Sequence, residues 1–319
     1  MSESRPLDQR VMQRIKLREL RMLMAVVHEG SMSKAAAKLA LSQPAISKAI
    51  AEMEHTLGVS LLDRTAQGVE PTLYGRALLK WANTVFDDLL QGVREIEFLA
   101  DPTQGEIRLG CVENMNAGLV PAVIERLARQ YPRVVFTVTT ASGINAQIRD
   151  LRERRVDFVF GRIVSPMQDQ DDLSIEILCE DPLIVVAREG SKWLRRRKIV
   201  LADLVNDPWC LSPADPDYPI GTFVAQAFKA QGLDPPRLTV RTNSPNLCYS
   251  MVGHFLSVAP ASVLRMSGKR FGLKAVPIDF LIRPGPIGII TLKNRTISPV
   301  AQLFIDYARK LTKSLAKKE

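Results

Sequence analysis

The sequence predicts an α/β protein with an all-helical N-terminal part. Apolar residues recur at helical spacing up to about residue 99, and short apolar strands alternate with helices from Gly105 onward. The chain has 319 residues, of which 46% are hydrophobic, and this exceeds the length that one core usually serves. More than one domain is therefore expected.

The first predicted helix ends at Gly30, and a short second helix covers residues 34–39 with Ser33 as its N-cap. The alanines of the second helix are small enough to let another helix approach closely. The predicted buried face of the first helix follows three- and four-residue spacing and consists of Leu17, Leu20, Met24 and Val27.

A third helix begins after its predicted N-cap Ser42, carries Pro44 in its first turn and stops at Gly58. Its expected core stripe is Ile46, Ile50, Met53 and Leu57. Gln43 and Ser47 project from the exposed N-terminal turn, so this helix is buried on one side and offers short polar groups on the other.

A small hairpin and a long helix follow. Residues 60–62 and 68–70 bracket a basic, hydroxyl-bearing tip, which we interpret as a wing. Thr72 is the predicted cap of a helix that runs to about Leu99. Near-heptad spacing on this helix predicts packing against a partner helix and dimerisation; the two apolar rows are Leu78, Trp81, Val85, Leu89, Ile96 and Leu99, and Phe86, Leu90 and Val93.

The remaining pattern predicts a parallel sheet covered by helices. Strands are expected at residues 107–112, 134–139 and 156–160, with helices between them. A second set of strands and helices runs from Leu183 to about Pro260, and the chain ends in a strand near 287–292 and a helix near 299–315.

Composition narrows the class of protein. The net charge of +9 favours an acidic partner such as nucleic acid or an anionic ligand, although residues 1–100 carry almost as many acidic as basic side chains. No apolar run is long enough to cross a membrane and the start does not resemble a signal peptide, so we expect a soluble cytoplasmic protein. No metal site, cofactor or disulfide framework is expected from the spacing of Cys111, Cys179, Cys210, Cys248, His28, His55 and His254.

Two segments resemble the helix-turn-helix signature of the LysR-type transcriptional regulators: residues 30–36 (Gly-Ser-Met-Ser-Lys-Ala-Ala) and 41–47 (Leu-Ser-Gln-Pro-Ala-Ile-Ser). The chain departs from the signature at two positions: it has Met53 where the family usually has Leu, and Leu62 where the family usually has Phe. The match continues through Ile50, Glu54, Leu57, Gly58, residues 61–64, Pro71, Thr72 and Gly75. Weaker similarity covers the rest of the chain, at residues 119–121, 131–132 and 156–158.

This resemblance implies a sequence-specific DNA-binding transcriptional regulator. Its parts would be a winged helix-turn-helix domain (1–72), a linker and dimerisation helix (73–100) and an effector-binding domain (101–319). That domain would be periplasmic-binding-protein-like, with two Rossmann-like lobes (105–179 with 276–319, and 180–275) and crossovers near 179–181 and 271–276. The implied partners are double-stranded DNA, a small-molecule effector, further copies in a homodimer or homotetramer, and RNA polymerase if the protein activates transcription.

The sequence also bears on two other function classes. A Rossmann-type enzyme would need a Gly-rich phosphate loop or a nucleophile with its base, and GxGxxG, P-loop and GxSxG motifs are all missing from the sequence, so no enzyme is expected. A solute-binding receptor would share the sensor fold, but it would need a signal peptide and would have no use for residues 15–72.

The helix-turn-helix resemblance suggests a DNA interface. The N-terminal residues of the second helix of such a motif reach base edges in the major groove. Gln43 can pair with adenine, Lys48 can donate to guanine or phosphate, and Arg64 and Thr65 of the wing would contact the backbone. The expected DNA-binding residues are Ser31, Ser33, Ser42, Gln43, Pro44, Ser47, Lys48, Arg64 and Thr65.

The effector is expected outside the carboxyl ends of the sheet strands, where helix N-termini present free N–H groups. Arg162 resembles a basic position of aromatic-acid-responsive relatives, whereas Ile144 stands where family sensors often have a hydroxyl and Glu113 would disfavour an anion nearby. Organic acids, sugars and amino acids stay open, with a lean towards a small acid or sugar-like metabolite. The expected effector-binding residues are Asn114, Asn116, Ser142, Gly143, Arg162, Ser212, Thr242 and Asn243.

Overall fold

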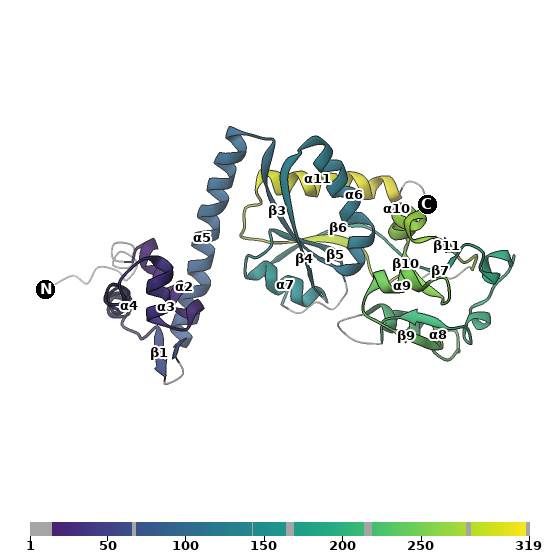
Figure 1. Cartoon of the computed structure of the whole chain (residues 1–319), viewed down its shortest axis with the longest axis horizontal. Coiled ribbons are helices and arrows are strands. Elements are labelled where there is room, and N and C mark those ends of the chain that lie inside the picture. Colours follow the sequence, from purple (N-terminus) through teal and green to yellow (C-terminus); the bar gives the residue numbers. More distant parts are fainter. Residues whose placement is uncertain are drawn as a thin grey trace. The chain divides into compact units, whose positions relative to one another are not determined.

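The chain forms two units, Met1–Leu90 and Gln91–Glu319, which Figure 1 colours along the sequence. The computed structural model describes residues 15–65, 68–141, 143–163, 169–213, 219–278 and 282–316.

Three short helices make up most of the first unit: α2 (Leu17–Glu29), α3 (Met32–Leu39) and α4 (Gln43–Leu57). Gly30 ends α2 in the left-handed conformation, as expected. The predicted cap of α3 is wrong, because Ser31, not Ser33, is the extended residue before the first turn, and its hydroxyl accepts from Lys34 N at 3.5 Å. Ser33 therefore lies inside α3.

The core of this unit lies between α2 and α4. Ile46, Ile50 and Met53 of α4 are fully buried, which confirms most of its predicted stripe. On α2 the prediction was only partly right. Leu20 is buried, but the other buried residues are Met22, Leu23 and Val26, while Leu17 is 45% exposed. Because α2 contacts α3, α4 and the hairpin, its buried face is wider than a single stripe and is rotated from the expected one.

The predicted hairpin is present, with strands β1 (Leu62–Thr65) and β2 (Gly68–Pro71) paired antiparallel. Val69 N donates to Gly30 O at 3.0 Å, which fixes the hairpin to the end of α2. Gly68 has φ of +136°, and a Cβ there would lie 2.7 Å from Gly30 O. Only glycine fits this contact without strain.

Helix α5 (Leu73–Ala100) begins in the first unit and ends in the second. Thr72 caps it, as predicted, since Gly75 N donates to Thr72 Oγ1 at 3.0 Å. Leu78 and Phe86 pack against the core of the first unit. Most of the predicted apolar rows are exposed in the described chain, namely Trp81, Val85, Leu89, Leu90, Val93, Ile96 and Leu99.

The second unit contains a five-stranded sheet in the order β4-β3-β5-β12-β6. Its strands are β3 (Gln104–Val112), β4 (Arg133–Ala141), β5 (Phe158–Arg162), β6 (Leu173–Cys179) and β12 (Ile287–Leu292). The expected parallel pairing holds for β3 with β4 and β5, but β12 runs antiparallel to both of its neighbours. Helices α6 (Leu119–Gln130) and α11 (Pro299–Ala316) pack on one face, and α7 (Ile144–Arg152) packs on the other.

The second lobe of this unit has two smaller sheets. Strands β10 (Ser257–Pro260) and β11 (Leu273–Ala275) pair antiparallel with β7 (Leu183–Arg188), and β8 (Trp209–Leu211) pairs parallel with β9 (Leu238–Arg241). Its α-helices are α8 (Pro219–Ala230), α9 (Pro245–Met251) and α10 (Ala261–Phe271). Short 3₁₀ helices are η2 (Lys192–Arg195) and η3 (Leu201–Leu204) in this lobe and η1 (Glu113–Ala117) after β3.

Two connections join the lobes. The first lies between β6 and β7, at residues 180–182. The second comes later than the expected 271–276, because β11 adds a strand beside β7 and Ile282 still bridges to Leu183. The chain therefore returns to the five-stranded sheet through residues 283–286.

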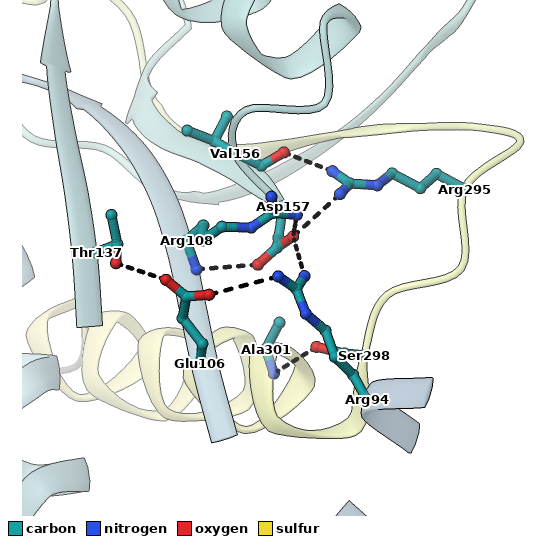
Figure 2. Close-up of polar contacts among 9 residues, drawn as sticks. All are labelled: Arg94, Glu106, Arg108, Thr137, Val156, Asp157, Arg295, Ser298 and Ala301. Atoms are coloured by element: carbon teal, nitrogen blue, oxygen red, sulfur yellow. Dashed lines mark hydrogen bonds and ion pairs between the residues drawn. The ribbon is translucent and has the colours of Figure 1, made fainter. Parts of the chain in front are cut away.

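A buried carboxylate lies at the start of β5, surrounded by three arginines (Figure 2). Asp157 Oδ1 accepts from Arg108 Nη2 at 2.7 Å and from Arg295 Nη2 at 3.0 Å, and it lies 3.6 Å from Arg94 Nη1 of α5. Arg94 Nη2 also donates to Glu106 Oε2. The Asp157 cluster thus connects the end of α5 with the sheet.

Candidate functional site

The first candidate surface is the N-terminal turn of α4. Ser42 is its N-cap, as predicted, and accepts from Ala45 N at 3.3 Å, with Pro44 in the first turn. Gln43, Pro44 and Lys48 are exposed and Ser47 is half-buried, whereas Ile46 between them is buried. The turn therefore presents short polar side chains from a rigid base.

A hydrogen bond from the preceding helix orients one of these side chains. Ser33 Oγ donates to Gln43 Oε1 at 3.1 Å. The carbonyl oxygen of an amide has two acceptor lone pairs, so Gln43 keeps one lone pair and both Nε2 hydrogens for another partner. Ser33 thus positions Gln43 although it does not cap α3.

The wing is held against α4 by a carboxylate. Glu54 Oε1 accepts from Leu61 N at 2.7 Å and from Leu62 N at 3.3 Å. Thr65 is exposed, and its hydroxyl donates to Gly68 O across the hairpin. The side chain of Arg64 lies outside the described residues.

The second candidate site is a cavity of about 370 Å³ between the two lobes of the second unit. One wall comes from the ends of β3, β4 and β5 and from the chain that follows β3 and β4. The other comes from the end of β8, the chain after β9, and α8, α9 and β10. Six of the predicted effector residues are part of its lining, namely Asn114, Gly143, Arg162, Ser212, Thr242 and Asn243.

Two predicted effector residues do not contribute to the described wall. Ser142 lies outside the described residues. Asn116 does not belong to the lining, and instead its Nδ2 donates to Thr140 Oγ1 at 2.8 Å while its Oδ1 accepts from Cys111 Sγ. Thr140 does line the cavity, so Asn116 contacts a lining residue without belonging to the lining itself.

Arg162, the positively charged side chain among the described residues of the cavity wall, forms hydrogen bonds with other residues of the protein. Arg162 Nη2 donates to Asp181 O at 2.8 Å and lies 3.7 Å from Asp181 Oδ2, while Nη1 donates to Gly285 O. Burial lowers the pKa of the Arg162 guanidinium, and Asp181 opposes this shift. Asp181 in turn accepts from Ser262 N and Ser262 Oγ. This network spans both connections between the lobes.

A second carboxylate joins the lobes at the cavity. Glu113 of η1 accepts at Oε1 from Ser244 Oγ at 3.1 Å and from Asn246 Nδ2 at 3.5 Å. Ser244 is also the N-cap of α9, where its hydroxyl accepts from Leu247 N. The start of α9 is therefore held by an acidic group of the opposite lobe.

Sequence reasoning missed other lining residues, above all Asp181, Tyr249 and Ser262. Tyr249 is almost completely buried, and burial raises the pKa of its hydroxyl. Asp181 had a usable signal, since it belongs to the expected crossover and a crossover between lobes borders the cleft. Tyr249 and Ser262 had none, because they lie inside helices far along the chain.

The described residues also bear on membrane insertion and metal binding. In the part of the chain that the structure describes, no helix is both long and apolar enough to span a membrane. The same residues contain no group of three or more His, Cys, Asp or Glu side chains arranged to hold a metal ion.

Comparison with known proteins gives the family. The LysR substrate binding domain matches residues 100–313, and the bacterial regulatory helix-turn-helix protein of the lysR family matches residues 17–76. The chain belongs to the LysR family. Among curated relatives, the HTH-type transcriptional regulator GbpR of Azospirillum brasilense is 32% identical over 91% of this chain and 84% of its own length. BenM of Acinetobacter baylyi is 31% identical over 92% of this chain and 94% of its own length.

Solved structures of LysR regulators agree with the fold. Full-length BenM is 27% identical, with a TM-score of 0.53 over 95% of this chain and 98% of that chain. CbnR complexed with its target DNA is 22% identical, with a TM-score of 0.51 over 93% of this chain and 100% of that chain, and supports the fold alone.

Family membership confirms the main sequence predictions. The chain is a LysR-type transcriptional regulator with a helix-turn-helix DNA-binding part and an effector-binding domain, and it is not an enzyme. LysR regulators bind DNA and small-molecule effectors and form oligomers.

Proposed function

We propose that the first turn of α4 reads operator DNA and that the cavity between the lobes holds the effector, which the protein senses without changing it chemically. One observation carries the proposal: the cavity of about 370 Å³ opens where the ends of three sheet strands face the second lobe. This volume lies in the range of small-molecule sites, about 300 to 1000 Å³. The protein would work in the cytoplasm, where its DNA is.

The proposed DNA contacts divide into two roles. Gln43 and Lys48 read base edges, with Gln43 held in place by the hydroxyl of Ser33. Arg64 and Thr65 of the wing contact phosphates and fix the register without reading sequence. Ser31, Ser42, Pro44 and Ser47 complete the interface, the first two mainly as caps that hold the helix starts rigid.

The effector contacts follow from the cavity lining. Asn114 and Gly143 contribute from the first lobe, Ser212, Thr242 and Asn243 contribute from the second, and Arg162 lies at the first connection between them. A ligand that contacts both walls binds the closed arrangement of the lobes better than an open one. That difference in affinity is what lets it shift the conformational equilibrium.

The exposed apolar rows of α5 are the proposed contact between copies of the chain. Trp81, Val85 and Leu89 lie one helical turn apart along the same face and are all exposed. Packing such a row against the same row of a second copy would bury it in a coiled coil. The proposed division of labour is DNA binding in 1–72, dimerisation in 73–100 and sensing in 101–319.

The DNA-reading role is tested with the full-length protein and operator DNA from upstream of its own gene. Gln43→Ala should cost about 1 to 3 kcal/mol on the operator and little on random DNA. Arg64→Ala is the matched control and should weaken both DNAs alike. If the two variants lose equal binding free energy on both DNAs, the assignment of base reading to Gln43 and of backbone contact to Arg64 is wrong.

The effector site is tested by footprinting with and without candidate metabolites. Asn114→Trp should fill the cavity and abolish the change in footprint that an inducer causes, while affinity for the operator without inducer is retained. A variant that keeps the wild-type response would exclude this cavity. Turnover of the inducer would contradict a purely sensory role.

A further inference from the structure

The excess positive charge of the chain lies outside its DNA-binding part. Residues 1–100 carry 13 Lys or Arg against 12 Asp or Glu, whereas residues 101–319 carry 30 against 22. Contacts between cationic side chains and phosphates supply a large share of the affinity of proteins for DNA, and DNA-binding domains are usually strongly basic. The helix-turn-helix part of this chain is nearly neutral, so its net charge contributes little to DNA affinity.

The second lobe of the effector-binding domain contains a dense group of cations. Residues 192–198 have the sequence Lys-Trp-Leu-Arg-Arg-Arg-Lys and form η2 and the chain that follows it. We call these residues the basic segment. Its five basic residues are all exposed, namely Lys192, Arg195, Arg196, Arg197 and Lys198. A run of this kind is typical of surfaces that bind nucleic acid or another polyanion.

Buried residues fix the backbone of the basic segment near both of its ends. Ser191 caps η2, where its hydroxyl accepts from Trp193 N at 3.4 Å. Trp193 packs in the core of the second lobe and donates from Nε1 to Asp207. Ile199, directly after the segment, is buried in the same core and bridges to Ile278. Runs of like charge are usually disordered, whereas this one presents its cations from a fixed backbone.

Three of the five cations have no acidic partner among the described residues. Lys192 Nζ lies 2.9 Å from Asp207 Oδ1, and Arg196 Nη1 lies 3.9 Å from Asp203 Oδ2. The cations that form no ion pair with any described residue are Arg195, Arg197 and Lys198. Because like charges this close in sequence repel one another, an anion that binds among them lowers their free energy.

We propose that the basic segment binds phosphates of the DNA backbone and is a second DNA contact besides the helix-turn-helix. DNA is the polyanion that regulators of this family bind. Its phosphates carry one negative charge per about 1.7 Å of helix axis, so several neighbouring cations can each meet a phosphate. Phosphate contacts add affinity without reading sequence. The segment thus supplies electrostatic affinity that the nearly neutral helix-turn-helix lacks.

The test is the salt dependence of DNA binding by the full-length protein. Affinity is measured by fluorescence anisotropy over a range of KCl concentrations, on the operator with several helical turns of flanking DNA and on random DNA of equal length. The segment variant combines Arg195→Gln, Arg197→Gln and Lys198→Gln. The slope of log affinity against log salt concentration should become less steep by at least about 2, since each phosphate contact contributes about 0.9. Affinity at about 0.1 M salt should fall at least about tenfold on both DNAs.

The matched control removes three exposed cations outside the basic segment. Arg129→Gln, Lys229→Gln and Lys313→Gln together make the same change in net charge, on α6, α8 and α11. The slope of this control should stay close to that of the wild-type protein, because salt screens charges that do not contact a phosphate. Both variants should unfold at the wild-type temperature, since all the replaced residues are exposed. If the segment variant unfolds earlier, its three single variants replace it, and each should flatten the slope by about 0.9.

Three outcomes would overturn the inference. An unchanged slope for the segment variant would exclude a DNA contact and leave the basic segment to an acidic protein partner. An equal flattening in the control would mean that net charge alone accounts for the effect. A loss of affinity confined to the operator would contradict a phosphate contact, which does not distinguish sequences. The reading role of Gln43 is tested separately, because Gln43→Ala should lower affinity for the operator with little effect on random DNA.

Discussion

The DNA-reading surface and the effector cavity are held together in different ways. At the start of α4, each polar contact joins residues close in sequence, such as Ser33 and Gln43, which are ten positions apart. At the cavity, Glu113 and Ser244 are 131 positions apart. Elsewhere in the second unit, the Asp157 cluster joins β3, the start of β5, α5 and the chain after β12. The reading surface therefore depends on local capping, and the sensor depends on buried charges brought together by the fold.

The largest expected effect is the loss of the central charge in the Asp157 cluster. Asp157→Asn should destabilise the second unit by about 3 to 5 kcal/mol, because three arginines would then share a site without their carboxylate. Denaturant unfolding, combined with hydrogen exchange to locate the loss, measures this effect.

The control for Asp157→Asn is Glu106→Gln, in the same cluster. Its side chain is 41% exposed and contacts Arg94 at 3.4 Å, so the loss should stay below about 1 kcal/mol. Equal losses for the two variants would show that burial does not decide the strength of these contacts. The contrast between the sensor and the reading surface would then lose its physical basis.

A smaller effect should appear at alkaline pH. Burial raises the pKa of the Cys111 thiol from 9.0 to about 11. Between these values the unfolded chain releases the proton and the folded chain keeps it, so stability should fall as pH rises, by on the order of 2 kcal/mol in total. Residues 1–110 contain no cysteine, so the first unit lacks this contribution.

Cys111→Ala isolates the contribution of this thiol. Its free energy of unfolding should change less steeply with pH than that of the wild-type protein between pH 9 and about 11. Other groups titrate in both proteins and cancel in the difference. Identical slopes would contradict a raised thiol pKa.

The smallest effect is expected at the reading surface. Ser42→Ala removes the cap on Ala45 N and should cost about 1 kcal/mol of stability in the first unit. Ser33→Ala is the partner experiment. It frees Gln43 but caps nothing, so stability should change by less than about 0.5 kcal/mol while discrimination between operator and random DNA decreases. Equal losses of stability for Ser42→Ala and Ser33→Ala would contradict the view that Ser42 caps α4 while Ser33 only orients Gln43.

The difference between local and long-range contacts also explains which features the sequence alone could predict. The turns, caps and core stripe of α4 were recovered because Ser42, Pro44 and Gly58 act on their immediate neighbours. Four strands of the five-stranded sheet, β3, β4, β5 and β12, were recovered from short apolar runs, whereas β6 was not predicted. The direction of β12 was not, because antiparallel pairing with β5 depends on how the chain returns from the second lobe.

Long-range contacts were less visible in the sequence. Strand-end geometry identified Asn114, Gly143 and Ser212 as cavity residues, since each follows a strand. It also selected Asn116, which is not part of the lining and donates a hydrogen bond to Thr140. The pairing of Arg162 with Asp181 could not be read from spacing, because the two residues are 19 positions apart and come together only in the fold.

Arg94 has a consequence for dividing the protein into fragments. It lies on α5, yet its guanidinium contacts Glu106 and Asp157, and Phe98 of the same helix packs against the core of the five-stranded sheet. A sensor fragment cut at residue 101 would lose a cation from a buried cluster and an aromatic ring from its core. In chimeras between regulators of this family, the junction should therefore lie before Arg94. The last turns of α5 then stay with the effector-binding domain, in which Arg94 pairs with Glu106 and Asp157.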